Sequence, residues 1–233
     1  MEIVKTKNYS ELSREAVAMV ISQINGEPNS VICLPTGKTP LKMYKLLVKA
    51  NKCGEVDFSK VIFLNLDEYF PIDSKDKKSF SYYLSKNFFD KINVKKSNVH
   101  LLNSNVRDSA KECRDYESLI RKHPIDLAIL GVGVNGHIAF NEPGSFVNSK
   151  TRFVELTSES KKINRVDKDA LTVGIGTIIK SKKIILLASG KKKSEAIRHL
   201  VKGKPNKKYP VSFLKGHRDL TVIVDKKAGS LSV

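Results

Sequence analysis

Residues 125–146 read IDLAILGVGVNGHIAFNEPGSF, and they carry the clearest indication of the fold class. The apolar run at 125–130 is too short to span a membrane and lies between Pro124 and Gly131. It therefore predicts a buried strand that runs into a glycine-rich turn. In an open α/β sheet, ligands bind in the crevice outside the carboxyl ends of the strands. We expect the chemistry of this chain to lie just beyond this strand.

Strand and helix patterns alternate on both sides of this stretch, which favours a mostly parallel sheet covered on both faces. We expect apolar strands at 1–6, 30–35, 99–102, 125–130, 182–190 and 219–224, and in the apolar part of 60–69 that precedes two acids. The segments at 152–157 and 170–180 lie between the central stretch and the strand at 182–190. Amphipathic spacing predicts helices at about 10–24, with Ser10 as N-cap, and at 41–50, 79–92, 109–122 and 191–202. The expected fold is a three-layer α/β/α, Rossmann-like domain.

The length of 233 residues, without a Pro/Gly/Ser-rich linker, predicts one domain over 1–233 with a small lid at about 150–170. The chain shows neither a signal-peptide core nor an apolar run of membrane-spanning length, so we expect a cytoplasmic protein without membrane contact. Three widely spaced cysteines without a CxxC pattern argue against a disulfide framework and a structural zinc site.

The formal charge of +18 raises the alternative of nucleic-acid binding. The lysines and arginines are dispersed, however, and they do not form the interleaved aromatic and basic pattern of a single-strand binder, a zinc finger or a basic-zipper helix. A lysine-rich solvated surface is the better interpretation. Such a surface raises the local concentration of anionic small molecules such as sugar phosphates.

A tight turn at residues 36–39, reading TGKT, follows the predicted strand at 30–35 and feeds a helix that begins near Pro40. Unpaired N–H groups at such a helix start, together with Thr36, Lys38 and Thr39 around Gly37, could cradle a phosphate. The spacing is not that of a Walker A loop. A plain strand-to-helix turn remains the alternative.

Asp67 and Glu68 directly follow an apolar run, where a carboxylate can be tuned as a proton-transfer base. The alternative is that one of them caps the next segment or pairs with a surface lysine. In the glycine-rich stretch after the strand at 125–130, His137 can move protons near neutral pH, and Glu142 and Asn135 are near enough to orient it. We expect the ends of three strands, at 34–39, 65–69 and 131–142, to meet at one rim of the sheet. Together their side chains predict acid/base chemistry on a phosphorylated small molecule.

The run GVGVNG also satisfies the dinucleotide pattern GxGxxG. The residues after it contain Pro143 and Gly144 where a long helix should run, and an acidic residue does not end the next strand at the usual distance. We therefore rank nicotinamide binding below proton transfer.

The chain resembles the glucosamine-6-phosphate deaminase (isomerase) family in six segments that occur in the family's order. They are LPTGKTP at 34–40, NLDEY at 65–69, GVGVNGHIAFNEPGS at 131–145, TR at 151–152, ALTVGIGT at 170–177 and ASGKKKSEAI at 188–197. The run GHIAFNEPG is the most specific of them. The related 6-phosphogluconolactonases share the fold but depart after the GH pair, and they remain the first alternative. A non-catalytic sugar-phosphate-binding module is the second.

The resemblance implies conversion of glucosamine 6-phosphate and water to fructose 6-phosphate and ammonia without a cofactor or metal. By its motif positions, Asp67 would move a proton between C2 and C1, and His137 would open the sugar ring, held by Glu142 and Asn135. The 36–39 turn would bind the phosphate with help from Lys193 and a lid arginine.

Three departures from the family pattern bear on these assignments. Arg165 is the nearest candidate for the lid arginine, although it does not align without a gap. Position 135 is Asn where some members carry Asp, and an amide does not stabilise an imidazolium by charge. Val154 and Glu155 replace the Lys and Thr of members activated by N-acetylglucosamine 6-phosphate, so we expect no such activation. The sequence allows either a monomer or a homo-oligomer.

Overall fold

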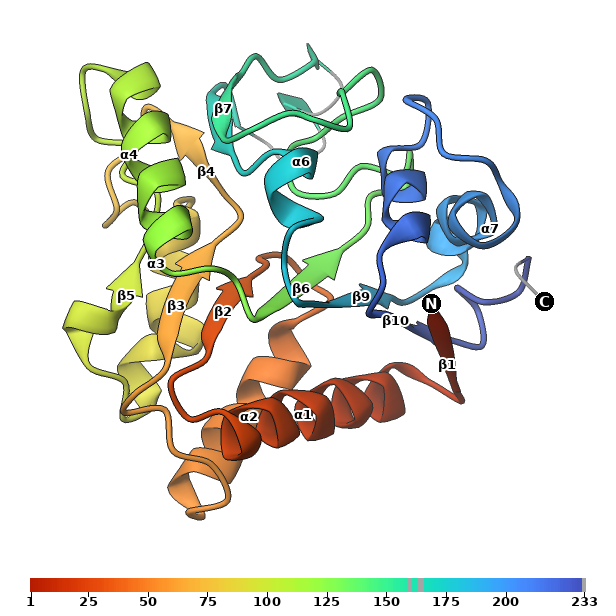
Figure 1. The fold of residues 1–233 in the computed structure, drawn as a ribbon, viewed down its shortest axis with the longest axis horizontal. Helices are drawn as coiled ribbons and strands as arrows, with labels where there is room; N and C mark the ends of the chain where they lie inside the picture. Colours follow the sequence, from red (N-terminus) through yellow and green to blue (C-terminus); the bar gives the residue numbers. More distant parts are fainter. Residues whose placement is uncertain (159–160, 163–165, 232–233) are drawn as a thin grey trace.

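The computed structural model describes residues 1–158, 161–162 and 166–231. A seven-stranded sheet runs through the molecule, and its neighbouring strands are parallel (Figure 1). Its order is β1 (Glu2–Thr6), β10 (Leu220–Asp225), β9 (Lys183–Ala188), β6 (Leu127–Gly131), β2 (Val31–Leu34), β3 (Ile62–Asn65) and β5 (Val99–His100). The prediction of a mostly parallel sheet is confirmed.

Helices cover both faces of this sheet, which confirms the three-layer prediction. One face carries α1 (Tyr9–Gly26), α2 (Leu41–Lys52) and α3 (Phe80–Asn87). The other carries α4 (Ser109–Lys122), α6 (Ile175–Ile178) and α7 (Ser194–Lys202). Short 3-10 turns lie at η1 (Phe89–Lys91), η2 (Lys96–Asn98), η3 (Lys191–Lys193) and η4 (Pro210–Gly216).

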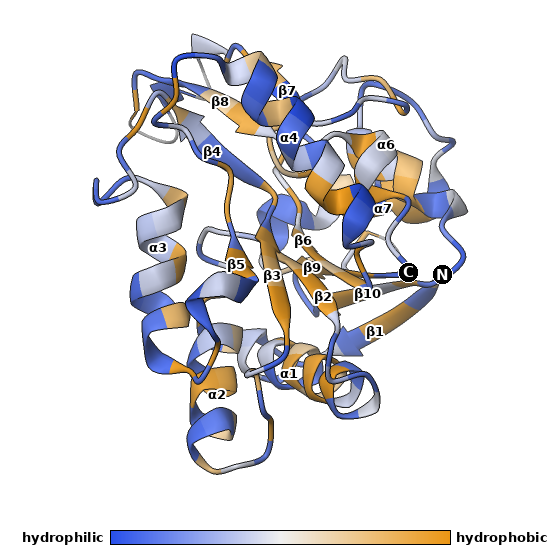
Figure 2. Cartoon of the chain, turned by 60° about the vertical axis from the view of Figure 1, so that its left-hand side comes forward, coloured by the Kyte–Doolittle hydropathy of each residue, from blue (hydrophilic) through white to orange (hydrophobic). Residues whose placement is uncertain are grey.

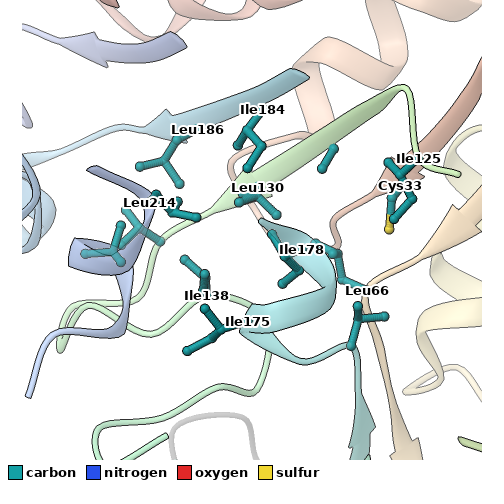
Figure 3. Close-up of a cluster of buried hydrophobic side chains, with 14 of the residues drawn as sticks. Cys33, Leu66, Ile125, Leu130, Ile138, Ile175, Ile178, Ile184, Leu186 and Leu214 are labelled. Carbon is teal, nitrogen blue, oxygen red and sulfur yellow. The ribbon is translucent and has the colours of Figure 1, made fainter. Parts of the chain in front are cut away.

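The apolar residues that predicted the strands form the core between these layers. Figure 2 shows the hydrophobic colour concentrated in the strands of the central sheet. On the α6 side, Leu130 and Leu186 from neighbouring strands belong to the same buried cluster as Ile175 and Ile178 of α6 (Figure 3). Near-continuous apolar strands are expected when both faces of a parallel sheet are buried.

A second, three-stranded antiparallel sheet was not predicted. Its order is β4 (Asp67–Phe70), β8 (Asp169–Thr172) and β7 (Arg152–Val154). Within the segment at 60–69, only Ile62–Asn65 belongs to the parallel sheet, and the chain leaves that sheet after Asn65 to begin β4 at Asp67. The Asn65 carboxamide stabilises this bend: Nδ2 donates to the Asp67 carbonyl at 2.8 Å, and Oδ1 accepts from Leu102 N at 2.9 Å.

Other element boundaries shift by a few residues. Asn8, not Ser10, caps α1, since its Oδ1 accepts from the N–H groups of Ser10 and Glu11. The segment at 152–157 is a strand only to Val154, and the segment at 170–180 divides into β8 and α6. The helix expected over 79–92 ends at Asn87, and the helix expected from 191 begins as a 3-10 turn.

Strands β6, β2 and β3 are neighbours in the parallel sheet. Their carboxyl ends lead into residues 131–142, 36–39 and 65–69, so the predicted meeting of these three segments at one rim is confirmed.

In the part of the chain that the structure describes, no helix is long and apolar enough to cross a membrane. Cys33 and Cys113 are buried, Cys53 is exposed, and all three thiols are free.

Candidate active site

The carbonyl groups of the 36–39 turn are held by tyrosine hydroxyls from two helices. Tyr83 of α3 donates to the Gly37 carbonyl at 2.5 Å. The hydroxyl of Tyr9 in α1 lies 3.0 Å from the Lys38 carbonyl and 2.9 Å from the Thr39 carbonyl. Gly37 has a φ of +93°, a left-handed conformation that favours glycine. These bonds fix the direction of the peptide groups in the turn.

The backbone N–H groups of residues 36–39 have no acceptor within the described part of the chain. They precede the first turn of α2, where the helix dipole also favours negative charge. Free amides at a helix start form an anion-binding arrangement. The geometry of this turn therefore suits a phosphate, with the Lys38 side chain exposed beside it.

Lys193 lies on the same rim, beyond the carboxyl end of β9, two strands away from β2. It is half-buried, and burial lowers the pKa of its ammonium below the usual value. The chain before it is fixed by the Asp225 carboxylate, which accepts from Ser189 Oγ at 2.6 Å and from Gly190 N at 3.0 Å. Arg165, the predicted lid arginine, lies outside the described residues.

Asp67 begins β4 with only 7% of its surface exposed. Burial, and secondarily the charge of neighbouring Glu68, raises the pKa of its carboxyl group to about 8. Among the described residues, no donor makes a hydrogen bond to this carboxylate. A carboxylate in such surroundings is a stronger base than one in water, and it is free to accept a proton.

Glu68 is completely buried and caps the start of α3. Its two carboxylate oxygens accept hydrogen bonds at 2.8–2.9 Å from the backbone N–H groups of Tyr69, Phe80 and Ser81 and from Ser79 Oγ. Four donors stabilise the charged form of a buried carboxylate. Of the adjacent acids at 67 and 68, Glu68 therefore has the capping role considered from the sequence. Within the described residues, such donors do not reach the Asp67 carboxylate.

His137, Asn135 and Glu142 form a closed set of contacts after β6. His137 Nδ1 lies 2.8 Å from Asn135 Oδ1 and 3.4 Å from Glu142 Oε1. Asn135 Nδ2 donates to Glu142 Oε2 at 2.7 Å. The side chain of His137 is 35% exposed, against 17% for Glu142. The imidazole is therefore oriented through Nδ1 while part of it faces the solvent.

The glycine at position 133 makes room for this imidazole. A β-carbon there would lie 2.3 Å from the His137 ring atoms Cε1 and Nδ1. The Gly133 N–H also donates to the His137 carbonyl at 2.8 Å. The backbone after β6 thus curls tightly around the histidine, which explains the close spacing of glycines in this stretch.

Thr172, which the sequence did not single out, connects the two halves of the site. It is the register partner of Asp67 in the small sheet. Its hydroxyl accepts a hydrogen bond at 3.1 Å from the N–H of Phe140, between His137 and Glu142. Its place in the segment at 170–177, which carried the family resemblance, is the signal that marked it.

Asn141 and Arg152 also hold the segment around Glu142, and neither was predicted to do so. Asn141 Nδ2 donates to the carbonyls of Ile138 and Val173 at 3.0 and 2.8 Å. Arg152 of β7 donates to Asn141 Oδ1 at 2.9 Å and to Ser145 Oγ at 3.3 Å. Both belong to segments that carried the family resemblance, which is the signal that marked them.

An aromatic cluster packs between β4, α3 and the segment after His137. The ring of Tyr69 lies 4.6 Å from that of Phe80 and 5.5 Å from that of Phe140, measured between centroids. Leu156 and Val166, from the predicted lid, are buried in the same cluster. The described ends of that segment therefore pack beside the strand that carries Asp67.

A parallel α/β sheet with free turn amides, a buried carboxylate and an oriented imidazole at its carboxyl rim defines the class of proteins that bind and transform small anionic ligands there. The chain belongs to the glucosamine-6-phosphate isomerase/6-phosphogluconolactonase family, whose model matches residues 5–223. The family resemblance inferred from the sequence is confirmed.

Relatives over the full length carry the name glucosamine-6-phosphate deaminase. One from Thermoanaerobacter sp. (strain X514) is 47% identical over 240 residues, covering 99% of this chain and 95% of the relative. One from Halothermothrix orenii is 42% identical and covers 99% of this chain and all of the relative.

Solved structures agree with this relationship. A monomeric glucosamine-6-phosphate deaminase, 38% identical, superposes with a TM-score of 0.96 over 99% of this chain and 100% of its own. A 6-phosphogluconolactonase from Trypanosoma cruzi has a TM-score of 0.84 at 21% identity, covering 98% and 96% of the two chains, and shares the fold alone.

Proposed function

We propose that this chain converts glucosamine 6-phosphate and water to fructose 6-phosphate and ammonia. One observation carries the proposal: Asp67, buried and with its pKa raised to about 8, lies on the same rim as an oriented imidazole and a turn with free amides. The identity of 47% over nearly the whole length to a protein named glucosamine-6-phosphate deaminase supports the same reaction.

The phosphate would be bound by the N–H groups of residues 36–39. Their carbonyls are already engaged by Tyr9 and Tyr83, so the turn needs little rearrangement to receive an anion. Lys193 would add a positive charge that burial makes more effective than an exposed ammonium. The formal charge of +18 would raise the rate of encounter with a sugar phosphate.

Ring opening would be the task of His137. Breaking the bond between C1 and the ring oxygen needs a proton on that oxygen and loss of the proton from the C1 hydroxyl. Asn135 and Glu142 engage Nδ1, which leaves Nε2 as the nitrogen for proton transfer. An imidazole held in one orientation is suited to this step, because a general acid or base must first lie within hydrogen-bonding reach of the proton it transfers.

Asp67 would then carry the isomerisation. Its carboxylate removes the proton from C2, and the electron pair of the C–H bond forms a C1–C2 double bond while O1 is protonated. Return of a proton to C1 gives a ketimine at C2. Water adds to that carbon, and ammonia leaves, so the products are fructose 6-phosphate and ammonia. Burial favours the neutral carboxyl, and so strengthens the carboxylate as a base.

A comparison of two substrates tests this function. With glucosamine 6-phosphate we expect stoichiometric ammonia and fructose 6-phosphate, and with 6-phosphogluconolactone we expect hydrolysis no faster than the spontaneous rate. Lactone hydrolysis without ammonia release would favour the lactonase alternative. Binding of glucosamine 6-phosphate without turnover would favour a non-catalytic module.

A further inference from the structure

A turn outside the predicted site holds the loop that carries His137 and Glu142. The backbone N–H of Val211 donates to the Gly136 carbonyl at 2.8 Å, directly before His137. The N–H of Gly144, two residues after Glu142, donates to the Lys207 carbonyl at 2.9 Å. Residues 207–211 therefore bind the loop at both of its ends.

Tyr209, in the middle of this turn, packs against the loop next to His137. Gly136 has a φ of +82°, and a β-carbon at that position would lie 3.0 Å from Tyr209 Cδ1 and 3.2 Å from Tyr209 Cα. The tyrosine therefore occupies the space beside the residue that joins Asn135 to His137. A shift of the Tyr209 ring would therefore change the contact that supports the backbone at Gly136.

The ring of Tyr209 is also supported by α7. The ring of His199 stacks on that of Tyr209, with centroids 3.5 Å apart and planes at 15°. His199 Nε2 lies 3.1 Å from Glu195 Oε1, one turn earlier in α7. Since Lys193 directly precedes this helix, the stack connects the helix of the candidate phosphate ligand to the loop of the candidate ring-opening residue.

The turn is itself rigidly built. Asn206 N donates to Ser212 Oγ at 2.9 Å, Ser212 N donates to the Tyr209 carbonyl at 2.8 Å, and Tyr209 N donates to Asn206 Oδ1 at 3.2 Å. Within the described residues, the hydroxyl of Tyr209 makes no hydrogen bond, so it is the ring that does the packing.

We propose that Tyr209 is a positioning residue for His137, acting through Gly136 and supported by the stack on His199. This inference rests on the proposed function, in which His137 opens the sugar ring. Misplacement of a catalytic group by about 1 Å can reduce a rate by about 100-fold. Loss of the Tyr209 ring loosens one of the contacts that set the place of the imidazole.

Two substitutions separate the ring from the hydroxyl. Tyr209→Ala is expected to lower kcat for ammonia release by at least tenfold with less than a threefold change in KM, whereas Tyr209→Phe keeps both within about twofold of wild type. Lys204→Ala, in the same connection but with an exposed side chain, is the matched control and is expected to leave both constants unchanged.

An open-chain ligand distinguishes positioning from general damage. 2-Amino-2-deoxyglucitol 6-phosphate lacks the C1 carbonyl and does not cyclise, so its binding needs no ring opening. We expect Tyr209→Ala to bind it with a Kd within threefold of wild type. An unchanged kcat in Tyr209→Ala, a parallel loss of kcat and of alditol affinity, or a failure of Tyr209→Phe to restore kcat would overturn the proposal.

Amide hydrogen exchange tests the contact between Tyr209 and the loop around His137 independently of catalytic activity. The Gly144 amide and the amides of the loop around His137 are expected to exchange faster in Tyr209→Ala than in wild type, and at the wild-type rate in Tyr209→Phe. Equal exchange in all three proteins would overturn the positioning role. A wild-type protein that releases no ammonia would overturn the proposed function alone.

Discussion

Asn135 Oδ1 lies 2.8 Å from His137 Nδ1, and the amide at the other end of the same side chain donates to Glu142 at 2.7 Å. A carboxamide can accept at one end and donate at the other. Asn135 therefore orients the imidazole and the carboxylate at once, without adding charge between them. A carboxylate at position 135 would lose the donation to Glu142 and place two acids side by side.

Replacing Asn135 tests this bridge. Asn135→Asp is expected to keep kcat within about tenfold of wild type, because the acceptor facing His137 is retained. Its added charge favours the imidazolium, so the contribution of His137 ionisation to its pH–rate profile moves to higher pH. Asn135→Leu removes both contacts and should lower kcat by about 100-fold. Identical profiles for wild type and Asn135→Asp would contradict the electrostatic part of this account.

The pKa of about 8 at Asp67 predicts how the rate depends on pH. The base must be ionised, so kcat/KM of the wild-type protein should rise as pH increases toward about 8. Glu68→Gln removes the neighbouring charge and should move this midpoint to lower pH. Ser79→Ala weakens the same helix cap but keeps the charge, and its midpoint should not move. A common midpoint in all three proteins would exclude Glu68 as a cause.

The same carboxyl predicts a stability effect with a definite sign. Its pKa is raised in the folded chain from 3.8 to about 8, so the unfolded chain loses this proton first as pH rises. The contribution of neutral Asp67 to stability is fully present below pH 3.8 and is lost progressively up to about pH 8. Relative to wild type, Asp67→Asn should therefore gain more in Tm at pH 8 than at pH 5. An equal gain at both pH values would contradict the raised pKa.

Gly37 tests the phosphate-binding turn. With a φ of +93°, alanine at this position carries a strain of about 1–2 kcal/mol, which would be relieved by distorting the turn. Gly37→Ala should raise KM about 5–30-fold with little change in kcat. Gly26→Ala is the matched control, because Gly26 has neither a positive φ nor a neighbour within 4 Å of a β-carbon. A reduction in kcat alone would place the turn outside phosphate binding.

Local patterns were sufficient for the parallel sheet and for the meeting of three strand ends. The segments at 125–130, 30–35 and 60–65 are predominantly apolar, a pattern that is typical of strands buried on both faces. The contacts of His137 with Asn135 and Glu142 could also be predicted, since Asn135 and Glu142 are only seven positions apart in one tight loop. The reaction and the roles of the site residues came from the family resemblance, because these local patterns do not specify them.

The small sheet and its contribution to the site depend on pairings that local sequence does not encode. Thr172 pairs with Asp67 across 105 positions of the chain, and its apolar neighbours mark only a buried strand. The bend after Asn65 depends on hydrogen bonds to Leu102 and Asp67, and an asparagine inside an apolar run carries no sign of them. Tyr209 is placed against Gly136 by the connection after α7, which has no strand or helix period to read.

Ammonia release from glucosamine 6-phosphate by wild type and by Asp67→Asn decides whether Asp67 is the base of an isomerising deaminase. We expect wild-type turnover, and a loss of at least about 100-fold in kcat for Asp67→Asn with alditol 6-phosphate affinity retained. Asp73→Asn, an exposed acid near the same strand, should behave as wild type. Ammonia release by Asp67→Asn at the wild-type rate would contradict the role of Asp67 as the base.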